Sequence, residues 1–180
     1  MIVLIGESGS GKDSIQKELV DHFGFHKIVT YTTRPPRVGE VDGKTYHFIS
    51  DEKFEEMNNK LMFGETAEYR GWKYASAIED YNDSAVIILT PHGLREVKKL
   101  LLPLHIVSIY VDVPRRERLI RILNRGDDIE EAYRRSLSDV GMFDGIADEV
   151  DFVVNNSSDV CTSPRIPAYE IHQFYYHEGR

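Results

Sequence analysis

The residues with the clearest capacity for chemistry lie near the start of the chain, in a glycine-rich stretch that could hold phosphate groups. Gly6, Gly11 and Lys12 match the front of the pattern G-x-x-x-x-G-K-[ST]. In this pattern the glycines let successive backbone N–H groups face a bound phosphate, and the lysine reaches the terminal phosphates of a nucleotide. We therefore predict a site for nucleotide phosphates here. The predicted phosphate loop consists of Gly6, Glu7, Ser8, Gly9, Ser10, Gly11, Lys12, Asp13 and Ser14.

Asp13 departs from this pattern. It stands where the pattern has a serine or threonine whose hydroxyl contacts Mg²⁺, and Ser14 follows it. An aspartate in the first turn of a helix suits the positive end of the helix dipole without binding a ligand. A carboxylate is also a hard oxygen ligand of the kind that Mg²⁺ prefers. We favour a metal ligand, because without a metal Asp13 would repel phosphates beside Lys12.

The elements on either side of the loop are those that must position it. The apolar run 2–5 indicates a buried strand, and apolar residues at Ile15, Leu19 and Val20 have helical spacing. A helix that starts at the loop adds the positive end of its dipole to the phosphate site. The order strand, loop, helix separates a phosphate site from a merely structural glycine turn.

Strands and helices alternate along the rest of the chain. This order predicts an α/β fold of the P-loop type, with three layers (α/β/α), a central parallel sheet and helices on both faces. We expect one domain, with a core at 1–29, 82–124 and 145–180, an inserted binding segment at 30–81 and a helical lid at 125–144. Further strands are expected at 25–29, 85–89, 105–111 and 151–154, an extended stretch at 61–76, and helices at 51–60, 93–102, 114–123, 129–142 and from 164 onward.

A second polar stretch, 30–50, contains prolines and glycines that exclude a regular helix. It carries Arg34 and Arg37 among several hydroxyl side chains. Guanidinium groups pair bidentately with phosphate oxygens, so this composition suits a phosphate monoester. If the stretch stood alone, a polar turn with surface arginines would be the better explanation.

Composition limits the classes of partner and location. The 180 residues carry a formal net charge of −8, which disfavours nonspecific binding to nucleic acid or to an anionic membrane. Cys161 is the single cysteine, so an internal disulfide is excluded. A lone cysteine fits a reducing compartment, and a buried structural thiol explains it equally well. No apolar run approaches the roughly 20 residues of a membrane span, and no leader precedes the phosphate loop. We expect a soluble cytoplasmic protein that acts on small molecules.

The stretch T-T-R-P-P-R-V-G-E-V-D-G-K-T-Y-H-F at 32–48 resembles the signature of the guanylate kinase family for its nucleoside monophosphate site. The resemblance extends to about Asn156. It implies ATP as phosphoryl donor with Mg²⁺, and GMP or dGMP as acceptor. The residues that the resemblance assigns to the acceptor phosphate are Arg34, Arg37, Tyr46 and Tyr74, and those that it assigns to guanine are Thr30, Glu65 and Ser76.

The resemblance also implies a catalytic role for Lys12 together with lid arginines that close on the transferred phosphoryl group. These arginines correspond to Arg121, Arg125 and Arg135. The lid is one residue shorter than usual in the family, so that Arg134 competes with Arg135 for the third position. Asn155 resembles a contact on the adenine side of the donor.

The chain departs from the family at the end of the strand at 85–89. Family members carry an Asp-x-Asp pattern there, whereas this chain has Ile88 and Thr90. This departure and Asp13 both resemble features of the ribose 1,5-bisphosphate phosphokinases. The phosphate loop of those enzymes also reads S-G-S-G-K-D-S. Glu65 favours a guanylate kinase, because a sugar phosphate has no guanine for it to bind.

Two other classes stay open. Guanylate-kinase-like modules that bind protein partners have lost catalysis and typically lack a working phosphate loop, which this chain retains at Gly6, Gly11 and Lys12. A generic P-loop ATPase would account for the start of the chain but leaves the stretch at 32–48 without a role.

Overall fold

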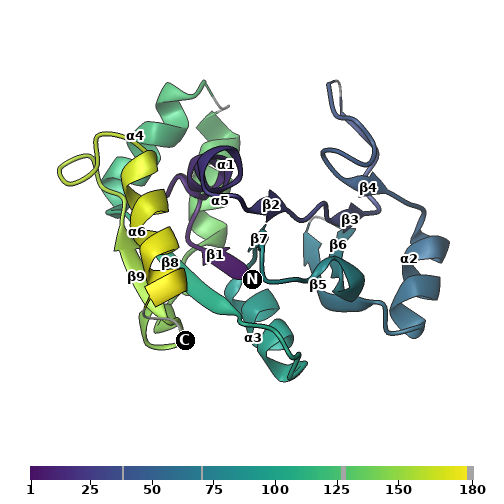
Figure 1. Cartoon of the computed structure of the whole chain (residues 1–180). Coiled ribbons are helices and arrows are strands. Elements are labelled where there is room, and N and C mark those ends of the chain that lie inside the picture. Colours follow the sequence, from purple (N-terminus) through teal and green to yellow (C-terminus); the bar gives the residue numbers. More distant parts are fainter. Residues whose placement is uncertain (38, 70, 127–128, 178–180) are drawn as a thin grey trace.

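The computed structural model describes residues 1–37, 39–69, 71–126 and 129–177. Five strands in this part of the chain form a parallel sheet that carries the phosphate loop (Figure 1). Its spatial order is β2 (His26–Lys27), β7 (Ala85–Ile88), β1 (Ile2–Ile5), β8 (Val107–Asp112) and β9 (Phe152–Asn155). The predicted central parallel sheet is therefore confirmed, although the strand expected at 25–29 has only two residues.

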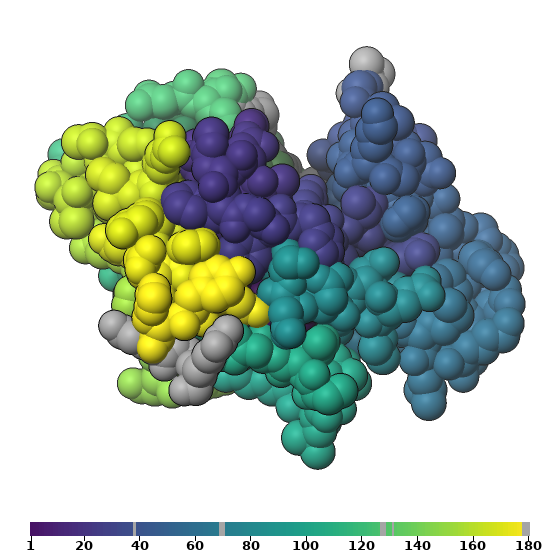
Figure 2. All heavy atoms as spheres, viewed as in Figure 1, coloured from purple at the N-terminus to yellow at the C-terminus, as the bar shows by residue number. Residues whose placement is uncertain are grey.

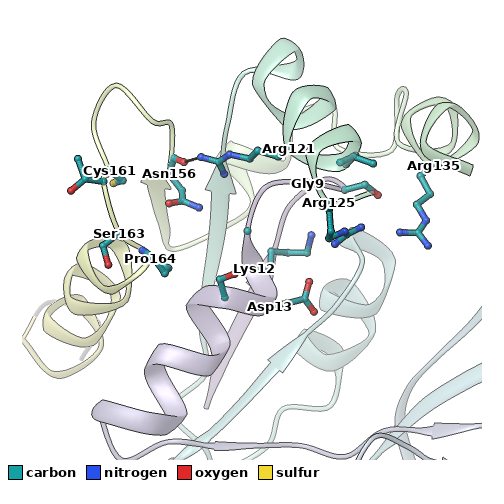
Figure 3. A pocket seen from close by; sticks show the side chains of 15 residues that line it. Gly9, Lys12, Asp13, Arg121, Arg125, Arg135, Asn156, Cys161, Ser163 and Pro164 are labelled. Carbon is teal, nitrogen blue, oxygen red and sulfur yellow. Dashed lines mark hydrogen bonds between the residues drawn. The ribbon is translucent and has the colours of Figure 1, made fainter. Parts of the chain in front are cut away.

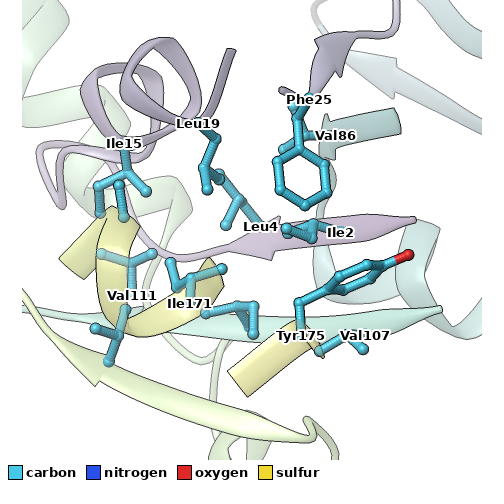
Figure 4. Close-up of a cluster of buried hydrophobic side chains, with 13 residues drawn as sticks. Ile2, Leu4, Ile15, Leu19, Phe25, Val86, Val107, Val111, Ile171 and Tyr175 are labelled. Carbon is cyan, nitrogen blue, oxygen red and sulfur yellow. The ribbon is translucent and has the colours of Figure 1, made fainter. Parts of the chain in front are cut away.

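Helices cover both faces of this sheet because side chains alternate along its buried strands. Ile2 and Leu4 pack against α1 (Lys12–His22) and α6 (Arg165–His177), as Figure 4 shows. Val3 and Ile5 point to the opposite face and pack against α3 (Pro91–Lys99). The result is the three-layer α/β/α arrangement that the sequence predicts.

A second sheet stands beside the first, on the other side of a hollow that is visible in Figure 2. Its order is β4 (His47–Phe48), β3 (Tyr31–Thr32), β6 (Trp72–Ala77) and β5 (Phe63–Tyr69). Helix α2 (Asp51–Asn59) packs on it through a small core of four buried residues: Phe54, Met57, Phe63 and Ala75. All four strands lie within the predicted insertion.

Two further helices lie near the phosphate loop. They are α4 (Arg115–Asn124) and α5 (Ile129–Ser138), and the α5 helix ends four residues before the predicted end at position 142. Two short 3-10 helices, η1 (Ile78–Asp80) and η2 (Ile146–Asp148), connect larger elements. Among the described residues, no helix combines the length and the apolar character that crossing a membrane requires.

Candidate active site

The phosphate loop lies between β1 and α1, and its shape depends on glycine at two positions. Gly9 and Gly11 have φ angles of 82° and 90°, which are left-handed values that favour glycine. A Cβ atom at Gly9 would lie 2.7 Å from the backbone oxygen of Arg118 in α4. A Cβ atom at Gly11 would lie 2.6 Å from Nδ2 of Asn156. The loop is therefore packed directly against α4 and against the segment that follows β9.

Lys12 begins α1 and directs its ammonium group back over the loop. Its Nζ donates to the backbone oxygen of Glu7 at 2.9 Å and to Oγ of Ser10 at 3.4 Å. Burial lowers the pKa of Lys12, while the nearby carboxylates of Asp13 and Asp139 oppose that shift. A cation held in this position can meet the terminal phosphates of a nucleotide.

The side chain of Glu7 is directed away from the phosphate side of the loop. Its carboxylate accepts a hydrogen bond from the Tyr110 hydroxyl at 2.9 Å and pairs with Arg118 at 3.1 Å. Tyr110 belongs to β8 and Arg118 to α4, so Glu7 fastens the loop to both elements. Glu7 does not line the donor cavity described below, and both of its carboxylate oxygens have partners outside that cavity.

Asp139 is a component of the site that the sequence analysis missed. It lies directly after α5, and its Oδ2 accepts from the backbone N–H of Ser8 at 2.8 Å. Its carboxylate also acts to raise the pKa of Lys12. No local motif marks this residue, because the contact joins segments that are 131 positions apart.

A cavity of about 490 Å³ opens beside the loop and forms a candidate donor site, which we call the donor cavity (Figure 3). Figure 3 shows Lys12, Asp13 and Arg125 gathered at one end, with Cys161, Ser163 and Pro164 at the other. The lining residues outside the loop are Arg121, Ile122, Arg125, Arg135, Asn156, Cys161, Thr162, Ser163 and Pro164. The segment 161–164, to which the sequence analysis assigned no part in the site, thus forms one wall.

The structure places Asn156, rather than the predicted Asn155, beside the phosphate loop. Asn156 is buried, lines the donor cavity and donates through Nδ2 to the backbone oxygen of Ser10 at 2.8 Å. Asn155 is the last residue of β9, and its side-chain oxygen accepts from Ser157 at 2.8 Å. The adjacent asparagines have opposite orientations because side chains alternate along an extended strand end.

The predicted lid arginines lie around the donor cavity. Arg121 is held in place by a hydrogen bond to the backbone oxygen of Asn156 at 2.6 Å and an ion pair with Glu117 at 2.7 Å. Arg125 and Arg135 line the donor cavity as well. Arg134 is exposed and lines neither this cavity nor the one described next, so the geometry favours Arg135 for the third position.

A second cavity, of about 560 Å³, lies between the two sheets, and we call it the acceptor cavity. It contains six of the seven predicted acceptor residues: Thr30, Arg34, Arg37, Tyr46, Glu65 and Tyr74. Its far side is formed by Ser8 and Lys12 of the loop, by Arg135 of α5 and by neighbouring residues. The seventh predicted residue, Ser76, lies behind Glu65.

Arg34 is the most firmly held cation of the acceptor cavity. It is 8% exposed, its guanidinium forms two hydrogen bonds with Glu40 at 2.8 and 3.0 Å, and it lies 5.5 Å from the centre of the Tyr46 ring. The pKa of Arg34 is raised, mainly by Glu40 and also by Tyr74. The hydrogen bonds from Arg34 and from the Arg37 backbone hold the pKa of Glu40 below its usual value. Glu40 therefore orients Arg34, a role that its place in the signature stretch did not reveal.

Glu65 is a buried carboxyl group, 7% exposed, on β5. Its Oε1 accepts from the Ser76 hydroxyl at 2.9 Å. Burial raises the pKa of Glu65 to about 7, and the hydrogen bonds from Ser76 oppose that shift. An acceptor of this kind, enclosed and with one oxygen already bonded, suits a ligand that presents N–H donors.

Thr90 has a structural role at the strand end where the family usually has an aspartate. It is the N-cap of α3, and its Oγ1 accepts from the backbone N–H of Gly93 at 3.1 Å. Both Ile88 and Thr90 line the acceptor cavity. The departure from the Asp-x-Asp pattern therefore removes two carboxylates from this wall and keeps the helix cap.

The residues around Asp13 fit a magnesium ion that arrives with a nucleotide. Among the described residues, no cluster of three or more His, Cys, Asp or Glu side chains could hold a metal by itself. Mg²⁺ in nucleotide sites needs only one or two protein oxygens in addition to phosphates and waters. Asp13 and Ser14 line the donor cavity next to Lys12 and supply a carboxylate and a hydroxyl there.

Comparisons with known proteins point to one family. The family model described as guanylate kinase matches residues 1–160. A guanylate kinase of Prochlorococcus marinus subsp. pastoris is 34% identical over 164 residues, which cover 87% of this chain and 88% of that protein. A guanylate kinase of Bacillus cereus is 34% identical over 179 residues, which cover 93% and 85%.

The similarity extends to a eukaryotic protein and to a solved structure. The guanylate kinase of Schizosaccharomyces pombe is 33% identical over 147 residues, covering 76% of this chain and 71% of that protein. A crystal structure of guanylate kinase from Anaplasma phagocytophilum aligns with a TM-score of 0.71 over 99% of this chain and 85% of that one. At 19% sequence identity, this structural likeness shows a shared fold and nothing more.

Proposed function

The chain belongs to the guanylate kinase family and is an enzyme of that family, and from this premise we propose that it transfers the γ-phosphoryl group of ATP to GMP or dGMP. The observation that carries the proposal is the meeting of the two cavities. Ser8, Lys12 and Arg135 line both of them. A donor phosphate and an acceptor phosphate can therefore approach each other where Lys12 and Arg135 supply positive charge.

The donor end is the phosphate loop. Backbone N–H groups of the phosphate loop after Ser8 and the ammonium of Lys12 would hold the phosphates of ATP. Asp13 and Ser14 would hold Mg²⁺, which would neutralise part of the charge of the phosphates. Adenosine would lie along the wall formed by 161–164 and Asn156.

The acceptor end has separate places for phosphate and base. Arg34, Arg37, Tyr46 and Tyr74 supply the guanidinium and phenol donors that a phosphate monoester needs. Glu65 would accept from N1–H and the 2-amino group of guanine, a donor pair that adenine lacks. We also propose guanine contacts for Thr30 and Ser76, which are grouped with the base in the family resemblance.

Phosphoryl transfer requires mainly alignment of the two substrates and neutralisation of the equatorial oxygens. Lys12, Arg121, Arg125 and Arg135 would provide that neutralisation. We propose that residues 30–81 and 125–144 close on the substrates, because an open site would allow water to attack ATP. The reaction uses small molecules and fits the cytoplasm, a reducing compartment with which the single cysteine is compatible.

The direct test is an ADP-release assay with ATP and Mg²⁺ and four acceptors: GMP, dGMP, AMP and ribose 1,5-bisphosphate. We expect turnover with GMP or dGMP and little with AMP. Turnover with the sugar bisphosphate alone would overturn the proposal and remove the role of Glu65. Turnover with none of the four would favour a protein-binding module.

The metal assignment has its own test in Asp13→Ser, which restores the usual residue of the pattern. If Asp13 is a Mg²⁺ ligand, the Mg²⁺ concentration needed for half-maximal activity should change in the variant. An unchanged Mg²⁺ dependence would show that the carboxylate only suits the helix dipole.

A further inference from the structure

Tyr81 joins the main core of the protein to the wall of the acceptor cavity. It follows η1, between the last strand of the second sheet and the β7 strand of the first. It is 7% exposed, and its ring belongs to the cluster of α3 and the first sheet that contains Val3, Ile5 and Leu94. Its hydroxyl lies 2.6 Å from Oγ of Ser76 in the second sheet. Ser76 in turn contacts Glu65 at 2.9 Å.

The direction of these hydrogen bonds follows from the available hydrogens. A serine hydroxyl has one hydrogen, and when Glu65 is ionised Ser76 gives it to the Oε1 atom of Glu65. Tyr81 must then donate to Ser76, since the Ser76 oxygen is left with lone pairs only. The hydrogen bonds therefore run in one direction, from Tyr81 to Ser76 and from Ser76 to Glu65. This order stabilises the ionised form of Glu65.

Two glycines show how closely the hydrogen-bonded residues Tyr81, Ser76 and Glu65 are packed. A Cβ atom at Gly64 would overlap the Tyr81 ring, with Cε2 at 2.6 Å. A Cβ atom at Gly93, in the first turn of α3, would lie 3.2 Å from Oε2 of Glu65. Tyr81 thus has a fixed position behind Ser76, and the free oxygen of Glu65 has a fixed position against α3.

We propose that Tyr81 is a positioning residue for the acceptor base, which holds Ser76 so that Glu65 keeps one oxygen bonded and presents the other to the ligand. The inference rests on the proposed function, because it takes guanine as the group that Glu65 binds. Tyr81 would thus influence which acceptor binds although it lines neither cavity. Because the Tyr81 ring is anchored in the main core, the same contact also fixes the second sheet relative to the first.

Tyr81→Phe removes the hydroxyl and keeps the ring, so it tests this role directly. We expect the KM for GMP to rise roughly tenfold, in the range for one hydrogen bond in a charged network, while the KM for ATP and kcat change little. Calorimetric binding of GMP without ATP should weaken by the same factor. A lower kcat with an unchanged KM for GMP would contradict a role in positioning the base.

Two further variants separate positioning from a general loss of stability. Tyr175→Phe is the matched control: Tyr175 is another buried tyrosine, and its hydroxyl donates to the backbone oxygen of Asp83 at 2.6 Å, outside both cavities. This variant should leave the KM for GMP unchanged. In a Ser76→Ala background, Tyr81→Phe should add no further increase, because its effect passes through Ser76.

The outcomes distinguish the inference from the function on which it rests. No turnover of GMP by the unaltered chain would overturn both. Turnover of GMP together with an unchanged KM in Tyr81→Phe, or an equal further increase in the Ser76→Ala background, would overturn only the role of Tyr81.

Discussion

The donor and acceptor cavities are built in different ways. The phosphate loop belongs to the main sheet, whose two faces bury clusters of thirteen and eleven apolar residues. Its shape depends on backbone packing, with Gly9 against α4 and Gly11 against Asn156. The acceptor side belongs to the smaller sheet, which has a core of four buried residues. Its arginine is oriented by a side-chain partner, Glu40.

This difference shows how one protein can combine a fixed donor site with a selective acceptor site. Backbone N–H groups bind any phosphate, so the loop needs a rigid shape and little selectivity. Recognition of a base depends on a few side chains that can be exchanged, and a small sheet tolerates their movement more easily than a large core does. The contact between Tyr81 and Ser76 joins the core of the main sheet to the smaller sheet.

The contrast is tested most severely at Lys12. We expect Lys12→Met to lower kcat by about 10³-fold or more, by analogy with the loss of other cations that stabilise phosphoryl transfer. Lys17→Met, on the exposed side of the same helix, is the matched control and should retain activity. The measurement is the ADP-release assay, with thermal unfolding to show that both variants fold. Full activity in Lys12→Met would refute the donor assignment.

On the acceptor side, Glu65 predicts a pH dependence of stability. Its folded pKa of about 7 lies above the usual value of 4.5, so the folded state keeps a proton that the unfolded state releases. The free energy of unfolding should therefore fall by roughly 3 kcal/mol between pH 4 and pH 8 on account of this group. Denaturant unfolding of Glu65→Gln should lack this decrease.

The exposed Glu68 on the same strand provides the control for this titration. Glu68→Gln should retain the decrease between pH 4 and pH 8. If Glu65→Gln and the unaltered chain show the same pH profile, the carboxyl group of Glu65 is not held in its neutral form by burial.

The two arginines of the acceptor cavity should differ in their tolerance of lysine. Arg34→Lys loses the paired hydrogen bonds to Glu40, and we expect the KM for GMP to rise about 30-fold, or about 2 kcal/mol. Arg37 is exposed, and Arg37→Lys should raise that KM only a few-fold. Initial rates at varied GMP would decide, and equal effects would show that Glu40 does not orient Arg34.

The smallest expected effect concerns Thr90. Thr90→Ala removes the N-cap of α3 and should lower the free energy of unfolding by about 1 kcal/mol, whereas Thr90→Asp keeps a capping oxygen and should lower it less. Chemical denaturation measures both. A loss of stability in Thr90→Asp as large as that in Thr90→Ala would mean that α3 requires the threonine methyl group rather than the capping oxygen.

The fold and the loop could be predicted because their signals are local. A short apolar run, glycines at fixed spacing and a following helix lie within twenty residues, and the alternation of strands and helices continues beyond them. The family resemblance, which starts from the stretch at 32–48, similarly predicted seven acceptor residues, and six of them line one cavity. The short length of β2 could not be predicted from the sequence, because the ends of a strand depend on its pairing with neighbouring strands.

The missed residues act through contacts between distant segments. Asp139 reaches Ser8, and Asn156 reaches Ser10, across 131 and 146 positions. Tyr81 has no motif around it, and it gains its place only when η1 turns its ring into the main core. Asn155 stays a prediction for the adenine side, but its neighbour Asn156 lines the donor cavity, because successive side chains on an extended strand point in opposite directions.

The position of Cys161 gives the protein a built-in reporter. Its thiol is the single one in the chain, is 7% exposed and lies in the wall of the donor cavity. Burial raises its pKa, so a thiol reagent should react slowly and mainly when the wall opens. The rate of labelling with a maleimide, measured at rising ATP concentration, would therefore record how often the donor cavity opens, with no mutation needed to introduce a label.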